Sequence, residues 1–162
     1  MTSRPQLQDP TLITEVAARL LPRVLRWFGA TMLPTEQIKL DLVDGLALHR
    51  DGYHLARWLE DQRDWDSDGN LVAILNYASF LRNDIYDQRV RDWVKNNQIH
   101  PELSVGDAVR VRDGEGAEHT GQIRCINYEE AQYQVFVESM GHTQRGAGVQ
   151  AMGVPYELVE QA

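Results

Sequence analysis

The chain is poor in cysteine and in long apolar runs, and both absences exclude classes of protein. Cys125 is the single cysteine among 162 residues, so neither an internal disulfide nor a four-cysteine metal site can form. No stretch approaches the roughly 20 apolar residues that a membrane-spanning helix needs. The first ten residues also lack the apolar core of a secretory signal. We therefore expect a protein of the reducing cytoplasm that does not enter a membrane.

Positive charge is scarce as well, above all in the last third of the chain. The whole sequence carries 16 Lys and Arg against 24 Asp and Glu, a formal net charge of −8. Residues 103–162 hold four arginines, no lysine and nine acidic residues, which gives this segment a net charge of −5. Because nucleic-acid affinity rests largely on Lys and Arg that neutralise phosphates, this balance disfavours nucleic acid as a partner.

The residues that carry catalysis in other proteins do not form a motif here. The five histidines show no His-Glu-x-x-His spacing, and no serine lies in a Gly-x-Ser-x-Gly setting. Cys125 lies in an alternating strand pattern, where a lone cysteine is usually a small buried apolar residue. We predict no cofactor and expect that the chain is not an enzyme.

One acidic segment matches the opening of a calcium loop. Asp64, Asp66 and Asp68 alternate before a glycine, as in the D-x-D-x-D-G pattern that brings carboxylates together. The twelfth position, where a bidentate glutamate is expected, is Leu75 inside an apolar helical pattern. The favoured interpretation is a linker in which Asp68 or Asn70 caps the next helix, and calcium binding is the alternative.

Residues 1–100 have helical periodicity and predict a bundle of about five helices. Pro22 lies inside the first helical pattern and should kink or split it. That first helix is apolar on a second side too, which leaves open a homodimer surface or a contact with the barrel formed by the last third of the chain. Aromatic residues of these helices, such as Tyr77, are expected to pack in the core. The five patterns begin near Pro10, Thr35, Tyr53, Leu71 and Asp84.

After His100 and Pro101 the periodicity changes from helical to alternating, which predicts two domains, residues 1–100 and 101–162. Residues 103–159 hold several short runs in which apolar and polar residues alternate, set off by Gly and Asp turns. Such runs predict a small antiparallel barrel. The fold class is therefore α+β, an N-terminal helical bundle followed by an antiparallel β-barrel.

The C-terminal pattern resembles SH3-like barrels of the KOW type. It holds a Gly-Asp turn at Val105 to Asp107, a Val-x-Val strand, a Gly-rich loop, a Gly-Gln-Ile strand from Gly121 and a last Val-Phe-Val run from Val135. The match covers residues 103–159, about a third of the chain. The resemblance implies binding to RNA, to protein or to a larger complex, and it seldom implies catalysis. The first loop holds Asp113 and Glu115 where nucleic-acid-binding members favour Lys or Arg.

The predicted outer face of this barrel supplies the candidate binding residues. If the alternating neighbours of Phe136 fill the barrel, Phe136 points outward. It then covers the helical domain, the favoured interpretation, or marks a partner surface. The exposed arginines form a basic strip or pair with acidic residues across strands. The candidate partner-binding residues are Phe136, Tyr128, Arg110, Arg112 and Arg124.

These features support three hypotheses about function. The leading one is a non-catalytic protein-interaction protein, adaptor-like or inhibitor-like, that binds a protein partner through the acidic barrel or the interdomain surface. The second is a nucleic-acid-binding regulator that uses Arg110, Arg112, Arg124 and Arg145. The third is an enzyme or an enzyme accessory subunit with a site between the domains.

Overall fold

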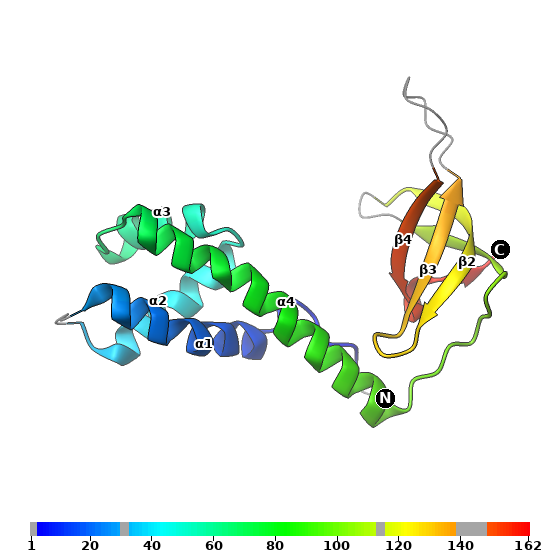
Figure 1. Cartoon of the computed structure of the whole chain (residues 1–162), viewed down its shortest axis with the longest axis horizontal. Coiled ribbons are helices and arrows are strands. Elements are labelled where there is room, and N and C mark those ends of the chain that lie inside the picture. Colours follow the sequence, from blue (N-terminus) through cyan, green and yellow to red (C-terminus); the bar gives the residue numbers. More distant parts are fainter. Residues whose placement is uncertain (1–2, 30–32, 113–115, 139–148) are drawn as a thin grey trace, which may run out of the picture. The chain divides into compact units, whose positions relative to one another are not determined.

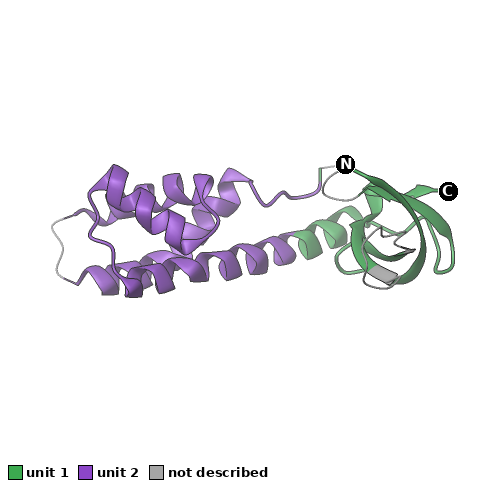
Figure 2. Cartoon of the chain, turned by 90° about the horizontal axis from the view of Figure 1, so that it is seen from above, with its two compact units in different colours: residues 1–3, 90–162 green, residues 4–89 purple. Residues whose placement is uncertain are grey.

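The computed structural model describes residues 3–29, 33–112, 116–138 and 149–162 (Figure 1). Four helices are followed by five antiparallel strands, so the chain is α+β as predicted. It divides into two compact units, which we call the helical unit (residues 4–89) and the sheet unit (residues 90–162 with 1–3) (Figure 2). These units are defined by how compactly the chain packs, which does not show whether either part folds alone. The domain boundary predicted between residues 100 and 101 therefore stays a prediction.

The helices number four rather than about five. They are α1 (Pro10–Phe28), α2 (Thr35–Leu48), α3 (Gly52–Arg63) and α4 (Gly69–Asn97). The two segments predicted as separate helices after residue 70 form the single helix α4, because residues 82–84 contain no Gly or Pro that would end it and Ile85 continues the buried side. Pro22 does not split α1, which continues from Pro10 to Phe28 with the proline inside it. None of the described helices is long and apolar enough to cross a bilayer.

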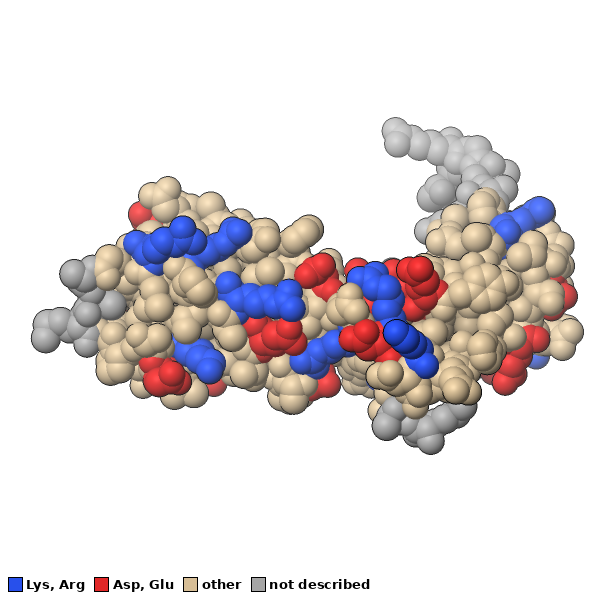
Figure 3. Space-filling view, turned by 60° about the horizontal axis from the view of Figure 1, so that its bottom comes forward, with Lys and Arg blue, Asp and Glu red and all other residues tan. Residues whose placement is uncertain are grey.

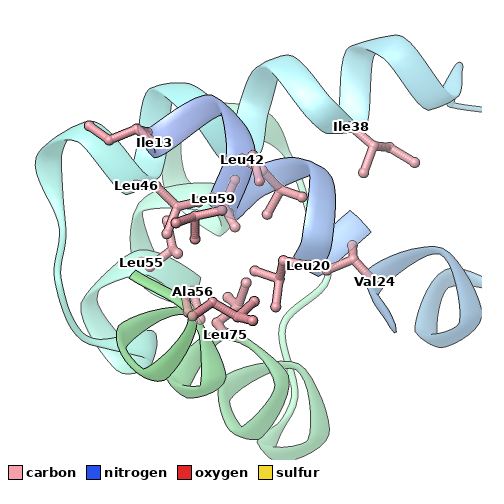
Figure 4. Packing of buried hydrophobic residues seen from close by; sticks show 14 of the residues in the cluster. Ile13, Leu20, Val24, Ile38, Leu42, Leu46, Leu55, Ala56, Leu59 and Leu75 are labelled. Atoms are coloured by element: carbon pink, nitrogen blue, oxygen red, sulfur yellow. The ribbon is translucent and has the colours of Figure 1, made fainter. Parts of the chain in front are cut away.

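The side chains of all four helices meet in one core (Figure 4). Leucine and isoleucine at helical spacing dominate it, and each such side chain that becomes fully buried contributes about 1.5–3 kcal/mol to folding. The largest apolar side chains that are fully buried in this core are Trp65, Leu12, Leu20, Ile38, Leu42, Leu46, Leu55, Leu59, Leu71, Leu75 and Ile85.

A polar contact is buried at the edge of this core. Asp41 of α2 is only 3% exposed, and its Oδ2 accepts a hydrogen bond of 3.1 Å from Nε1 of the buried Trp65. Its Oδ1 accepts a hydrogen bond of 2.8 Å from Gln37 Nε2. Arg63 Nε lies 3.1 Å from the same Oδ1 as an ion pair without hydrogen-bond geometry. The contact ties α2 to the segment that joins α3 and α4.

The strands form one antiparallel sheet in the order β4-β3-β2-β1-β5. Their bounds are β1 (Ala108–Arg112), β2 (Glu118–Asn127), β3 (Gln132–Glu138), β4 (Val149–Pro155) and β5 (Glu160–Gln161), with a short 3-10 turn, η1 (Tyr156–Leu158), between the last two. The predicted closed barrel is wrong. β5 has only two residues and both pair with β1, so among the described residues nothing pairs β5 with the other edge strand, β4.

The inner face of the sheet follows the predicted alternation. Tyr133, Val135 and Val137 are buried, while Phe136 between them is 37% exposed, which confirms that it points outward. Tyr156 of η1 packs its ring 4.4 Å from the ring of Tyr133. Burial, together with the nearby tyrosines, raises the pKa of Tyr156 to about 12. The sheet unit therefore has a core of its own.

A β-bulge in β2 breaks the alternation at one point. Ile123 pairs with Val135 and Cys125 pairs with Gln134, so Arg124 is an extra residue with no opposite number. As a result Arg124 and Cys125 are both exposed, although they are neighbours. The expectation that Cys125 is buried is therefore wrong.

Gly52, the first residue of α3, packs so closely against α4 that a side chain has no room. A Cβ atom there would lie 2.7 Å from the carbonyl oxygen of Val72 and would also meet Asn76. We expect Gly52→Ala to lower the free energy of unfolding by about 1–3 kcal/mol through overpacking. Gly69→Ala is the control, because no atom lies within 4 Å of its Cβ position. Urea unfolding followed by circular dichroism at 222 nm measures both, and equal stabilities would contradict the close packing.

The indole N–H of Trp65 is expected to stabilise the fold through Asp41. Trp65→Phe removes the donor and leaves a buried carboxylate oxygen unpaired, which we expect to cost about 1–3 kcal/mol of unfolding free energy. Trp27→Phe is the matched control, because Trp27 Nε1 donates to the exposed Asp68. An equal loss of stability in both variants, measured by thermal unfolding, would contradict a larger contribution from the buried hydrogen bond.

Candidate functional site

The outer face of the sheet carries four of the five candidate residues, and two of its arginines are paired with glutamates. Arg110 Nη2 lies 3.8 Å from Glu160 Oε2. Arg112 Nη2 lies 3.8 Å from Oε2 of Glu118, the residue directly opposite it on β2. Exposed pairs of this kind contribute at most about 1 kcal/mol, but they leave little net positive charge over β1 and β5.

Arg124 lies apart from the other two arginines. It stands six residues along β2 from Glu118, which opposes Arg112, and six residues of strand span about 20 Å. The three arginines therefore do not form one compact basic strip. Arg145, the fourth arginine of the nucleic-acid hypothesis, lies outside the described residues.

The other half of the outer face holds six neighbouring uncharged positions, and along β2 the exposed Arg124 of the bulge lies between two of them, Gln122 and Cys125. The register places Gln122, Phe136 and Ala151 side by side on β2, β3 and β4, and it places Cys125, Gln134 and Gly153 in the next row. We call these six residues the uncharged face. The sheet unit has a net charge of −5, so six neighbouring uncharged positions stand out from the rest of it. Charged residues are depleted at the centres of protein interfaces.

Phe136 is the largest side chain of the uncharged face. Its ring is flanked by Gln122 on one side and the small Ala151 on the other. Next to Ala151, Gly153 has no side chain, and only the Oε1 atom of Gln132 comes within 3.2 Å of its Cβ position. A half-exposed aromatic ring beside small residues is the kind of anchor on which binding energy concentrates.

Strand β4 borders the uncharged face and is an open edge. All seven of its residues pair with β3, and no described strand pairs with its other side. Residues 149–155 contain no charged side chain, and the only proline is the last of them. Edge strands are normally protected by charges, proline or a bulge, because their free N–H and C=O groups attract another strand. The described part of β4 therefore offers an unprotected seven-residue template.

Tyr128, the fifth candidate residue, lies away from the uncharged face. It is 62% exposed in the turn between β2 and β3, beside two glutamates. Asn127 fixes that turn, since its Oδ1 accepts a hydrogen bond of 3.2 Å from the backbone N–H of Glu130. Four residues of β3 separate the turn from Phe136, about 13 Å along the strand. One compact partner side chain cannot contact both rings.

The three aspartates of the calcium hypothesis have structural roles or face solvent. Asp64 ends α3 in the left-handed region with φ 53°, and Asp66 is exposed. Asp68 accepts hydrogen bonds from Leu71 N at 2.8 Å and Trp27 Nε1 at 3.0 Å. A metal ion would have to displace these donors. Among the described residues no group of three His, Cys, Asp or Glu side chains is placed to hold a metal.

Asp68 gives the helical unit a measurable acid sensitivity. The backbone hydrogen bond from Leu71, with those from Trp27 and Asn70, holds the pKa of Asp68 below its ordinary value of 3.8. A carboxyl group whose pKa is lower in the folded state contributes stability above its unfolded pKa and loses that contribution as the pH falls through the folded pKa. We expect Asp68→Asn to flatten the fall of unfolding free energy between pH 5 and pH 2, measured by urea titration. Asp66→Asn, in the same segment, should keep the wild-type slope; equal slopes for all three proteins would contradict the cap.

In comparisons with known proteins, no family model, no curated protein and no solved structure matches the chain. The function is therefore argued from the geometry of the site. The uncharged face and the β4 edge beside it are the surfaces of the sheet unit from which a binding function can be argued.

Proposed function

We propose that the chain is a non-catalytic protein-interaction protein, adaptor-like or inhibitor-like, that binds an extended segment of a partner protein at β4. The segment pairs with the edge as an additional strand. The observation that carries this proposal is the seven-residue edge of β4, which is unpaired on one side within the described chain and has no charge. Strand addition of this kind takes its affinity from main-chain hydrogen bonds and its specificity from alternate side chains.

The uncharged face supports the proposal by giving the added strand something to recognise. Neighbouring strands lie about 4.8 Å apart, so an added strand stands two spacings, about 10 Å, from the strand that carries Phe136. Ala151 and Gly153 lie between them and are too small to block the way. A long apolar side chain of the partner can extend over them to the exposed ring of Phe136.

The charge of the sheet unit indicates the partner's chemistry. With a net charge of −5 over residues 103–162, the unit attracts a partner whose flanking residues are basic. The edge itself is uncharged, so the paired segment is uncharged and apolar in its middle. Basic ends around an apolar strand are therefore the expected pattern, and they raise the rate of encounter more than the affinity.

The fold of the sheet unit, which we propose to be SH3-like, agrees with a binding role. Support comes from the small antiparallel sheet of order β4-β3-β2-β1-β5, in which the 3-10 turn η1 leads into the last short strand. Nucleic-acid binding through Arg110, Arg112 and Arg124 has less support, because two of these arginines face glutamates, and the third lies about 20 Å from Arg112 and about 13 Å from Arg110 along the sheet.

A lysine placed at the edge tests the proposal. Ala151→Lys puts a charge on the uncharged face, while Thr120→Lys puts the same charge on the same side of the sheet over β1 and β2; both positions are exposed. We expect wild type and Thr120→Lys to capture the same protein from nuclease-treated cell lysate. Ala151→Lys should bind that protein at least about tenfold more weakly, the equivalent of about 1.4 kcal/mol.

Hydrogen exchange on the purified complex locates the contact. Amides of residues 149–155 should exchange more slowly in the complex than in the free protein. Equal capture by Ala151→Lys, with no protection of β4, would overturn strand addition. Recovery of nucleic acid in place of a protein, lost after nuclease treatment or at high salt, would also contradict strand addition.

A further inference from the structure

Several arginines of the helical unit have no carboxylate partner among the described residues. Arg19, Arg57, Arg63 and Arg89 each have a carboxylate oxygen within 4 Å. Figure 3 shows that some basic side chains over the helices lie beside acidic groups and others lie apart from them. The arginines of this unit for which the described residues show no ion pair are Arg23, Arg26, Arg50 and Arg82.

Arg82 is explained by the fold. It is 9% exposed, and its Nη2 donates a hydrogen bond of 2.6 Å to the carbonyl oxygen of Leu46 near the end of α2. A cation at this place satisfies a free carbonyl and the helix dipole. The three remaining arginines are exposed; Arg26, in the last turn of α1, also donates a hydrogen bond of 3.3 Å from Nε to the carbonyl oxygen of Pro22.

Arg23 forms one end of a stack that crosses from α1 to α4. Its guanidinium carbon lies 3.8 Å from the centroid of the Tyr77 ring. Tyr77 in turn stacks on Phe80, with centroids 5.4 Å apart and ring planes inclined by 23°. Phe80 is 61% exposed, although contact between an apolar ring and water is energetically unfavourable. The stack therefore ends in an open aromatic ring.

Two further exposed arginines belong to neighbouring segments, Arg26 to α1 and Arg50 to the turn between α2 and α3. Arg26 follows Arg23 by one turn of α1 and lies on the same side of that helix. Viewed down α4, Phe80 lies between Tyr77 and Ser79, about 60° from Tyr77 and about 100° from Ser79. Ser79 Oγ donates a hydrogen bond of 2.7 Å to the backbone oxygen of Arg50. Phe80 thus lies between Tyr77, which contacts Arg23 of α1, and Ser79, which bonds the turn that carries Arg50.

We propose that this surface, the arginine-aromatic face of Arg23, Arg26, Arg50, Tyr77 and Phe80, binds single-stranded nucleic acid. A base stacks on the exposed ring of Phe80, and the arginines of this face contact the neighbouring phosphates. Stacking on aromatic rings combined with cationic contacts to the backbone is how proteins hold single strands without reading sequence. Duplex bases are stacked on one another and do not offer their faces to a side chain.

The proposal is independent of the protein-binding function, because it uses the other unit of the chain and none of the same residues. It also differs from the sequence-based hypothesis, which placed nucleic acid on the arginines of the sheet. The net charge of −8 opposes a polyanion at long range, so binding is expected to weaken steeply as salt rises.

Fluorescence anisotropy with a labelled 12-nucleotide oligo(dT) tests the proposal on the full chain. We expect binding at 50 mM salt that is weaker at 200 mM, and weaker binding to a duplex of the same length. Phe80→Ala should reduce affinity at least about fivefold, the lower end of the loss when one base stack is removed. The double variant Arg23→Gln with Arg26→Gln should reduce affinity and also flatten the salt dependence.

Two control variants keep the test specific. Arg57→Gln removes an exposed arginine that pairs with Glu60, and Phe136→Ala removes a half-exposed ring of the sheet unit; both should bind like wild type. Thermal unfolding checks that every variant is folded. The proposal is overturned if wild type does not bind at 50 mM salt, if Phe80→Ala binds as well as wild type, or if polyglutamate competes as strongly as the oligonucleotide.

Discussion

The buried contact between Asp41 and Trp65 is the constraint on which the helical unit depends. A carboxylate out of water is costly unless donors surround it, and here an indole N–H, an amide and a guanidinium supply that environment. The Trp65 ring also meets Phe28 edge to face with centroids 4.7 Å apart. The end of α1, the middle of α2 and the link between α3 and α4 therefore converge on one indole. Apolar packing alone tolerates several arrangements, whereas this hydrogen bond is satisfied in one.

Much of the helical unit was predictable from periodicity, and the misses share a cause. The sequence pattern located α1, α2 and α3 because apolar residues recur at helical spacing with caps or breaks between them. It divided α4 wrongly, since the polar run around Asn83 resembles a loop when its neighbours in space are unknown. Trp65 lies between two aspartates and Asp41 is itself charged, so the local sequence indicates exposure for both residues. A polar group that is buried because its partners come from elsewhere in the chain leaves no local signal.

The sheet and both candidate surfaces show the same limit. Alternation placed Phe136 outside correctly, but the bulge at Arg124 reversed the expectation for Cys125, because one extra residue changes the face of those that follow. The open edge of β4 depends on which strands pair and is invisible in sequence. Helical spacing predicts Tyr77 as core packing, and only its contacts with Arg23 and Phe80 show that it also supports an exposed ring. Small residues such as Gly153 matter through the space they leave, which sequence cannot display.

The uncharged edge of β4 has a consequence for the protein as a colloid. An unpaired strand edge can pair with the same edge of a second copy as well as with another protein, and net charge opposes such pairing through repulsion between copies. That repulsion comes from a net charge of −8 and vanishes near the isoelectric point of about 5.0, while the edge is unchanged by acid. The proposed strand pairing and the repulsion between copies thus depend on different residues, the uncharged residues of β4 and the carboxylates of the whole chain.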